Sequence, residues 1–376
     1  MQVDILQYLP EKAKIKIDHS IRKDLFLNKT VTEWAKFFNI PLKNASRYIN
    51  GTRSIPLRIL KQLIDLRKEN FNKLIGNIEI KIEKRGNYIK IGPLISINQE
   101  WIYIGELIRG DGHITPNFWN ITFVNNNWFL IKYVENFFKS IGIKSNQISI
   151  IRRNDANFLI IRSSVLAHLF NKILNIPTGK KSELNMPSFI ILNEKMGIAA
   201  VRGAFDAEGS VTSKGSRRIS ITSNSKNWLI QLKQILEKLR IESRIFEDKS
   251  KDGKQIYRLF ISHRSNLKKF LKIINPLHTK RKEKLKERLA DYKRNPQKMF
   301  HKKILLSVKD GYCRKRDISN KIKQSLITTG NNINWLKKKG YIVPYEKIHT
   351  NKGSFYNYKI TEKGESYLKD SLSFFD

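Results

Sequence analysis

The sequence predicts an α+β protein that is built around an internal duplication and carries a smaller domain on each side. Two similar segments form the duplication: 104–112 (IGELIRGDG) and 201–209 (VRGAFDAEG). Each is typical of a short apolar helix that ends in an acid followed by glycine, and strand-like residues follow at 113–115 and 210–212. Matching segments recur at about 100 residues, which is too long for a solenoid repeat and favours two similar subdomains in one chain.

Three pairs of segments set the period of the duplication. The acids Asp111 and Glu208 lie 97 residues apart, and Pro177 and Pro276 lie 99 residues apart. The tetrapeptides at 127–130 (NWFL) and 227–230 (NWLI) lie 100 residues apart. We align the two halves on these pairs, which makes the chain a pseudo-dimer.

The first domain, residues 1–76, is predicted to be all-helical. Helices at 31–38 and 42–49 flank Asn39, which tolerates the left-handed conformation of a turn. This pair resembles a repressor-type helix-turn-helix, although glycine is usual at that turn. The residues expected at the major groove are Lys43, Asn44, Arg47 and Tyr48, with Arg53 near the DNA backbone. A three-helix domain that contacts protein is the alternative. Residues 77–98 are predicted to form a linker or a β-hairpin.

Asp111 and Glu208 stand at the C-termini of the two predicted helices, where the negative end of the helix dipole disfavours an acid. Small residues that would let these helices pack closely are Gly105, Gly110, Gly203, Ala204 and Ala207. Such packing would bring the two carboxylates together, and a divalent cation would relieve their repulsion. Hard oxygen ligands suit Mg²⁺. A pair of ordinary helices with C-terminal glycines is the alternative, but two copies in register favour the metal site.

Residues 99–292 resemble the LAGLIDADG homing endonucleases. The second segment keeps DAEG at 206–209, whereas the first has Arg109 where the family often has an acid. The resemblance implies an αββαββα fold for each repeat, 99–192 and 193–292, with two sheets that form a saddle over DNA. It also implies that Asp111 and Glu208 are the catalytic, metal-binding acids. The carbonyls of Gly110 and Ala207 are further expected ligands.

Each repeat ends in a basic segment, at 177–182 and 276–282. Aligning the prolines places Lys181 over Lys280. The resemblance puts a lysine near each active site, where it stabilises charge on the phosphate or polarises water. We therefore predict that Lys181 and Lys280 are catalytic, with Lys180 and Arg281 as alternatives. Contact with the phosphate backbone alone is the competing interpretation.

The predicted strands carry polar and basic side chains on alternate positions, so each set faces one side of its sheet. Basic and amide side chains suit the reading of base edges, and lysines at hairpin tips suit phosphate contact. The residues expected to contact DNA are Gln147, Ser149, Arg153, Arg217, Arg218, Ser220, Thr222, Arg244, Lys249, Lys254 and Arg258. A solvated sheet face is the competing interpretation for any one of them.

The last domain, residues 298–376, resembles a winged helix. Its pattern predicts three helices, a two-stranded hairpin and a final helix, with Lys352 at the tip of the wing. That lysine suits the minor groove or the phosphate backbone of DNA. A role in contacting protein is the alternative.

Composition favours a polyanionic partner. Lys and Arg number 72 against 33 Asp and Glu, which gives a formal charge of +39 and a pI near 10.1. The sequence has no apolar run long enough for a membrane span, so we expect no membrane partner. The single cysteine, Cys313, excludes an internal disulfide framework and a zinc finger. We expect a cytoplasmic, nucleoid-associated monomer.

The sequence therefore predicts a site-specific endonuclease for double-stranded DNA that hydrolyses one phosphodiester on each strand with Mg²⁺, as in intron mobility. Two alternatives use the same scaffold. One is a DNA-binding transcriptional regulator, against which the presence of both acids argues. The other is an RNA maturase that binds intron RNA without cleavage.

Overall fold

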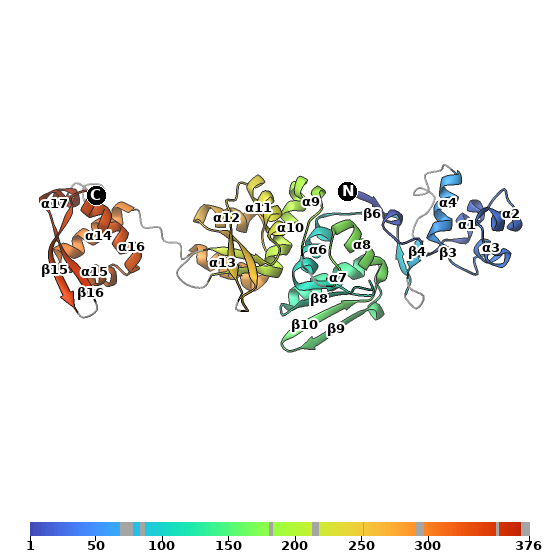
Figure 1. The fold of residues 1–376 in the computed structure, drawn as a ribbon, viewed down its shortest axis with the longest axis horizontal. Coiled ribbons are helices and arrows are strands. Elements are labelled where there is room, and N and C mark those ends of the chain that lie inside the picture. Colours follow the sequence, from blue (N-terminus) through green and yellow to red (C-terminus); the bar gives the residue numbers. More distant parts are fainter. Residues whose placement is uncertain are drawn as a thin grey trace. The chain divides into compact units, whose positions relative to one another are not determined.

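The computed structural model describes residues 1–67, 78–82, 87–179, 183–212, 218–250, 252–290, 297–350 and 353–369. The chain forms two compact units, 1–292 and 293–376 (Figure 1). Lys180, Lys181, Arg217 and Lys352, for which we predicted contacts with DNA or catalytic roles, lie outside the described residues. Among the helices that the structure describes, none is long and apolar enough to cross a membrane.

The first unit contains the two repeats, and each has the expected αββαββα order. The first repeat consists of α6 (Gln99–Asp111), β7 (Gly112–Ile114), β8 (Ile121–Asn125), α7 (Trp128–Ser140), β9 (Ile148–Arg153), β10 (Ala156–Ile161) and α8 (Ser164–Leu174). The second consists of α10 (Glu194–Glu208), β11 (Gly209–Val211), β12 (Ile219–Ser223), α11 (Lys226–Lys238), β13 (Arg244–Lys249), β14 (Gln255–Ile261) and α12 (Arg264–Ile273). The short helix α9 (Ser188–Leu192) precedes the second repeat, and α13 (Thr279–Ala290) follows it. The predicted α+β fold class is confirmed.

Each repeat has one antiparallel four-stranded sheet, with the strand orders β7-β8-β10-β9 and β11-β12-β14-β13. Side chains alternate between the two faces of each sheet. The inner face packs on the helices through buried apolar residues: Ile121, Phe123, Leu159 and Ile161 in the first repeat, and Ile219, Ile221, Leu259 and Ile261 in the second. We call the opposite side the outer face. It carries Ser149, Ile151, Arg153 and Phe158 in the first repeat, and Ser220, Thr222, Arg244, Phe246, Arg258 and Phe260 in the second.

Helices α6 and α10 pack directly against each other at the junction of the repeats (Figure 1). A Cβ on Gly110 would lie 2.5 Å from the Ala207 Cβ, and a Cβ on Gly203 would lie 2.7 Å from the Tyr103 carbonyl oxygen, so neither glycine can be replaced without moving a helix. Gly105, which we expected at this contact, faces Leu174 in its own repeat instead. Residues five apart on a helix point roughly 140° apart, so Gly105 and Gly110 cannot share one face.

The structure corrects the alignment of the two halves at their long helices. α7 follows the N-cap Asn127 and α11 follows the N-cap Ser225, so these helices begin 98 residues apart rather than 100. Trp228 therefore corresponds to Leu130, and both are fully buried. Trp128 corresponds to Lys226 and is 51% exposed. The alignment by sequence was wrong because the Asn-Trp dipeptides at 127–128 and 227–228 occupy different positions in the two helices.

The start of the chain is not all-helical, which corrects our prediction for residues 1–76. The helices α1 (His19–Leu25), α2 (Val31–Phe37), α3 (Leu42–Ile49) and α4 (Leu57–Arg67) are accompanied by β1 (Gln2–Asp4), β2 (Lys14–Lys16) and β3 (Ile55–Pro56). The strand β4 (Ile78–Lys81) pairs with β2 and with β5 (Ile89–Ile91), and β1 pairs with β6 (Leu94–Ser96). Strands of two or three residues are too short to show alternation, so the sequence pattern missed them.

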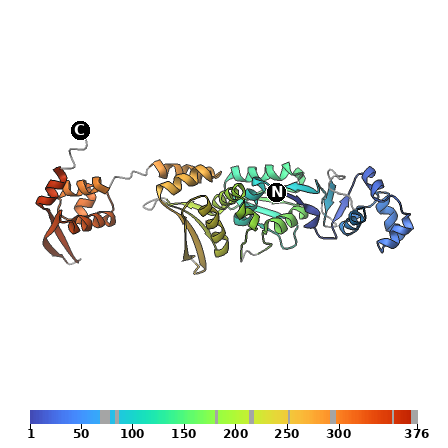
Figure 2. The same ribbon diagram turned by 90° about the horizontal axis from the view of Figure 1, so that it is seen from above.

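The second unit has the elements that we predicted for a winged helix. These are α14 (Gln297–Lys309), α15 (Lys315–Lys321), α16 (Leu326–Lys338), β15 (Ile342–Thr350), β16 (Gly353–Ile360) and α17 (Glu362–Lys369). β15 and β16 form an antiparallel hairpin, which projects from the helices in Figure 2. The small hydrophobic core of the second unit is formed by Ile304, Leu305, Ile318, Ile333, Leu336 and Ile342.

Candidate active site

The two predicted acids come together at the C-termini of α6 and α10. Asp111 is the last residue of α6, and Glu208 is the last residue of α10. Glu208 lies against the final turn of α6, because its Cγ is 3.1 Å and its Oε1 is 3.7 Å from where a Cβ on Gly110 would stand. Gly110 immediately precedes Asp111. The close packing of the two helices therefore places one acid from each repeat in a single site, as predicted.

Asn125, at the end of β8, orients the first acid. Its Nδ2 donates a 2.8 Å hydrogen bond to Asp111 Oδ2, and its Oδ1 accepts one from the Asn127 backbone N–H at 2.8 Å. The Asn127 side chain in turn lies 3.2 Å from His278 Nδ1, in the segment that closes the second repeat. Our sequence analysis missed this role. The run of three asparagines at 125–127 was the available signal.

Arg281 places a positive charge among the acids. Its Nη1 donates to the carbonyls of Phe205 (2.9 Å) and Asp206, and its Nη2 donates to the Ala207 carbonyl at 2.9 Å. All three carbonyls lie in the last turn of α10; the Phe205 carbonyl also accepts from the Gly209 backbone N–H, whereas those of Asp206 and Ala207 would otherwise lack partners within the helix. Burial lowers the pKa of the guanidinium, while the charges of Asp111, Asp206 and Glu208 oppose that shift. Arg281 is therefore a partly buried cation that interacts electrostatically with all three carboxylates.

Lys280, which we predicted to be catalytic, is exposed in the first turn of α13. Successive residues of a helix point about 100° apart, so Lys280 and its neighbour Arg281 cannot face α10 together. The structure directs Arg281 to the acids. The catalytic role of Lys280 stays a prediction, and Arg281 is the alternative that we named for it.

Asp206 anchors the segment that closes the second repeat. It is fully buried and accepts hydrogen bonds from the backbone N–H groups of Leu277 (2.8 Å) and His278 (3.1 Å). The Tyr103 hydroxyl on α6 donates a third, at 3.0 Å. Burial raises the pKa of Asp206, and the hydrogen bonds partly offset this. Asp206 is therefore an anchoring acid, distinct from Glu208 two residues later.

Arg109 occupies the corresponding position in the first repeat, two residues before Asp111. It is buried, and its guanidinium donates to the carbonyls of Leu174 (2.5 Å), Asn175 (3.1 Å) and Asn185 (3.2 Å). Its Nε also pairs with Glu106 Oε1 at 2.9 Å. The departure from the family motif at Arg109 is thus explained: the arginine holds the segment that closes its own repeat.

The donor set at the helix junction fits a hard divalent cation. Asp111 and Glu208 offer carboxylate oxygens, and the carbonyls of Gly110 and Ala207 lie beside them at the helix ends. Among the described residues, no three His, Cys, Asp or Glu side chains gather around one point, so water and substrate phosphates would complete the coordination of Mg²⁺. The Ala207 carbonyl already accepts from Arg281, so a metal there would compete with the guanidinium. A cavity of about 220 Å³ lies beside Glu208 and is also lined by Gly110, Ser223 and Trp228.

Residues 197–275 match the family model of the LAGLIDADG-like domain. The matched range includes Glu208 and the strands of the second sheet, and the first repeat has the same order of elements. The second repeat therefore carries a LAGLIDADG-like domain.

Three proteins illustrate what this chain is similar to. A structure of the homing endonuclease I-DmoI in complex with DNA and Mn is 22% identical and covers 47% of this chain and 96% of that chain, with a TM-score of 0.37. Full-length DUF199/WhiA from Thermatoga maritima is 11% identical and covers 65% of this chain and 93% of that one, with a TM-score of 0.38. A probable translation initiation factor IF-2 from Methanocaldococcus jannaschii is 26% identical over 222 residues, which are 57% of this chain but only 18% of the relative's length.

The outer face of the first sheet is less polar than we expected. Ser149 and Arg153 lie there beside Ile151 and Phe158. Gln147 does not, which corrects our prediction. It ends a short 3-10 helix (Ser145–Gln147), is 1% exposed, and bonds to the backbone of Lys144 and Arg162. β9 begins at Ile148, one residue later than the alternation of polar and apolar residues suggested. Gln147 therefore lies in the turn before the strand and stabilises that turn.

The outer face of the second sheet carries the predicted polar set. Thr222 stands opposite Arg258, and Ser220 and Arg244 stand opposite Phe260. Arg218 lies over the Phe260 ring at 4.2 Å, and Arg258 pairs with Asp248 at 3.1 Å. Lys249 and Lys254 are exposed at the hairpin end. Ser220 is on this face but only 8% exposed, because its larger neighbours cover it.

The two helices predicted on either side of Asn39 are present as α2 and α3, and Asn39 has the expected positive φ of 52°. Lys43 and Arg47 are exposed on α3, and Asn44 accepts a 2.7 Å hydrogen bond from Arg53. Tyr48 is only 6% exposed and cannot face a groove, which corrects our prediction. It lies three residues after buried Ala45, so both belong to the core side of α3.

Proposed function

We propose that this LAGLIDADG protein is a site-specific endonuclease that cuts both strands of duplex DNA with Mg²⁺. The meeting of Asp111 and Glu208 carries the proposal. Each acid ends a helix where the dipole disfavours it, and the helices pack so tightly that Gly110 has no room for a methyl group. A divalent cation would offset the repulsion between two carboxylates held at one helix junction, which is the chemical use that this placement supports.

Asp111 and Glu208, with the carbonyls of Gly110 and Ala207, would hold the metal. A bound Mg²⁺ lowers the pKa of water for attack on phosphorus and stabilises charge on the leaving oxygen. Asn125 holds the Asp111 carboxylate in one orientation through its 2.8 Å hydrogen bond. Arg281, which is already among the acids, would neutralise charge on the phosphate as DNA enters. Lys181 and Lys280 remain our candidates for polarising water near each site.

The basic outer faces would position the duplex over this site. Arg153 on the first sheet, and Arg218 and Arg244 on the second, are exposed. Exposed arginines suit both phosphate contact and the reading of guanine in the major groove. Lys43 and Arg47 on α3 would extend the footprint along the DNA. The formal charge of +39 supports a partner with many phosphates.

A DNA-binding regulator on the same scaffold is the second candidate, and one observation favours it. The guanidinium of Arg281 already supplies positive charge to the acids and donates to the Ala207 carbonyl. An arginine that fully balances the acids would leave them without need of a metal. Cleavage separates the two candidates, because both bind duplex DNA.

The test is selection from a randomised duplex library. The full chain is incubated with the library in Mg²⁺ or in Ca²⁺, and both the cut ends and the retained duplexes are sequenced. The endonuclease predicts cut ends at one sequence, on both strands with a fixed offset, in Mg²⁺ alone. Retention of one sequence without cut ends in Mg²⁺ would reject the endonuclease and favour the regulator.

A further inference from the structure

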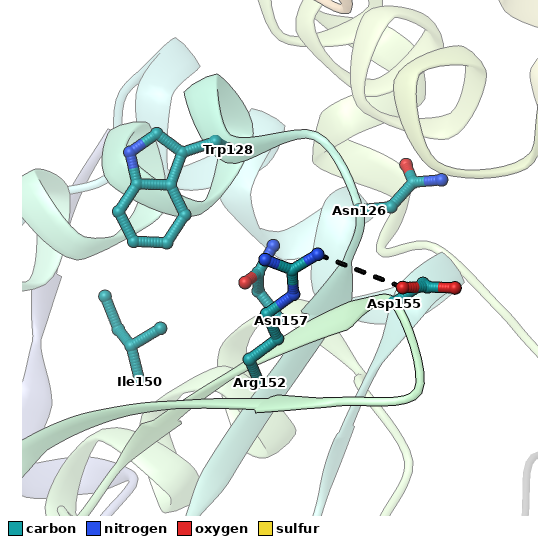
Figure 3. Close-up of a pocket in the computed structure, with 6 residues that line it drawn as sticks. All are labelled: Asn126, Trp128, Ile150, Arg152, Asp155 and Asn157. Atoms are coloured by element: carbon teal, nitrogen blue, oxygen red, sulfur yellow. Dashed lines mark ion pairs between the residues drawn. The ribbon is translucent and has the colours of Figure 1, made fainter.

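A pocket of about 580 Å³ opens on the first repeat, between the start of α7 and the hairpin of β9 and β10 (Figure 3). Its lining consists of Asn126, Trp128, Ile150, Arg152, Asp155 and Asn157. Asn157 stands opposite Arg152 and alternates with the buried Leu159, so both belong to the inner side of the sheet. The pocket therefore opens on the side opposite the outer face, to which we assign duplex DNA.

The second repeat fills the same place with an ion pair. The helix starts and the sheet registers relate Trp128, Arg152 and Asn157 to Lys226, Glu247 and Tyr257. Lys226 Nζ lies 2.7 Å from Glu247 Oε1 and 5.5 Å from the centre of the Tyr257 ring. The first repeat has none of these three residues. The pocket is thus a specific departure of one repeat from the other, rather than a gap that the fold imposes.

The lining combines a flat aromatic surface with hydrogen-bonding groups. The Trp128 side chain is 51% exposed, and Figure 3 shows its indole above Ile150 with Arg152 and Asn157 across the opening. Arg152 pairs with Asp155 at 3.9 Å, and both side chains are largely exposed, so the pair is weak. Lys132 Nζ lies 5.0 Å from the indole centre, where it also pairs with Glu135 at 2.7 Å.

We propose that this pocket binds one unstacked nucleotide of a single-stranded nucleic acid. The base would stack on Trp128, and Arg152 would contact its phosphate. The Asn126 amide and Asn157 Oδ1 would bond to the edge of the base, while Asn157 Nδ2 keeps its 3.4 Å hydrogen bond to the Asn125 carbonyl. A base inside a duplex cannot enter, because its neighbours cover both of its faces. The volume lies within the range of about 300 to 1,000 Å³ that is usual for small-ligand sites.

Binding of single-stranded twelve-residue oligonucleotides to the full chain tests the proposal. The probes are adenosine oligomers in the RNA and DNA forms, and an abasic oligomer of equal length and charge. Trp128→Ala should weaken binding of the adenosine oligomers on the order of tenfold or more, which is the usual contribution of one base stacked on an aromatic side chain. Binding of the abasic oligomer and of duplex DNA should not change.

Phe129→Ala is the matched control, since Phe129 is the next residue of α7, is 48% exposed and does not line the pocket. It should leave all affinities unchanged. The variant W128K/R152E/N157Y, which installs the ion pair of the second repeat, should abolish the base-dependent part of binding while the chain stays folded. If Trp128→Ala weakens binding of the RNA oligomer more than that of the DNA oligomer, the pocket prefers a nucleotide of RNA. If it weakens both equally, the pocket recognises the base and does not distinguish the two sugars. Equal losses for the adenosine and abasic oligomers, or equal effects of Trp128→Ala and Phe129→Ala, would overturn the proposal.

Discussion

The two repeats hold their closing segments with opposite chemistry at the same position. In the first repeat the buried Arg109 donates to three backbone carbonyls at and after the end of α8. In the second repeat the buried Asp206 accepts from the backbone N–H groups of Leu277 and His278. Each repeat therefore has an anchoring residue two positions before its acid, and either a donor or an acceptor can serve as that anchor.

The consequences for the buried charge differ between the repeats. Arg109 brings a positive charge into the core, and Glu106 pairs with it at 2.9 Å while also accepting from the Trp228 indole at 2.9 Å. Asp206 brings a negative charge, and Arg281 lies close enough to stabilise it. Arg281 of the second repeat therefore lies at the candidate active site, whereas the ion pair that balances Arg109 in the first repeat lies within α6.

The first prediction concerns what the repeats share, which is one acid each. Asp111→Asn and Glu208→Gln should each reduce cleavage by more than about a hundredfold, because even residues that only orient metal ligands contribute roughly 10- to 100-fold. Duplex affinity should persist, since it rests on the basic outer faces. Cleavage of the selected duplex and its binding in Ca²⁺ are measured together. Glu194→Gln, at the opposite end of α10, is the control, and full cleavage by either acid variant would remove the metal site.

The second prediction concerns Arg109, the anchoring residue of the first repeat. Arg109→Met leaves Glu106 buried without its ion-pair partner, which typically lowers the free energy of unfolding by about 3 to 5 kcal/mol. Urea unfolding of the full chain, with hydrogen exchange read in α6 and α8, measures the loss. Arg202→Met is the milder control, because Arg202 is only partly buried and donates to the Ile274 carbonyl. A cost for Arg109→Met no larger than that control would contradict the anchoring role.

The third prediction places acid sensitivity in the second repeat. Burial lowers the pKa of His278 to about 4 from 6.5, so the folded state resists protonation of this ring. The unfolded chain binds the proton first, and stability from this group is therefore lost as pH falls from 6.5 to about 4. The loss amounts to about 2 to 3 kcal/mol at pH 4. Gly179 holds the matching position in the first repeat, by the spacing of the prolines.

Hydrogen exchange at pH 7 and pH 4 checks this difference. Protection in α13 should fall more than protection in α8, and His278→Asn should flatten the pH dependence of α13. An unchanged pH dependence in that variant would show that other groups control the acid response.

The sequence was informative where the signal is local. The acid followed by glycine at each helix end, and its recurrence 97 residues later, predicted the two repeats and the pairing of Asp111 with Glu208. The helix-turn-helix was also predicted, because Asn39 marks its turn. In each case the residues that define the feature are neighbours in the chain.

The sequence was not informative where the partner is distant. Arg109 looked like a defect in the motif, because the carbonyls that it holds are at least 65 residues away. The sequence alone does not show whether Lys280 or Arg281 faces the acids, because this depends on which side of α13 packs against α10. The burial of Tyr48 and Gln147 likewise depends on elements that pack against them, which polarity alone does not reveal.

The smallest expected effect concerns the residues beside the two acids. Asn125 corresponds to Ser223, and both accept a hydrogen bond from the backbone two residues later. Asn125 also reaches Asp111 with its amide, whereas the shorter Ser223 borders the cavity beside Glu208. Asn125→Ser would make the first repeat like the second. It should slow cleavage of one strand about tenfold, the lower end of what orienting residues contribute. Nicked plasmid should then accumulate before linear product on a gel, and equal slowing of both strands would show that Asn125 does not act through Asp111 alone.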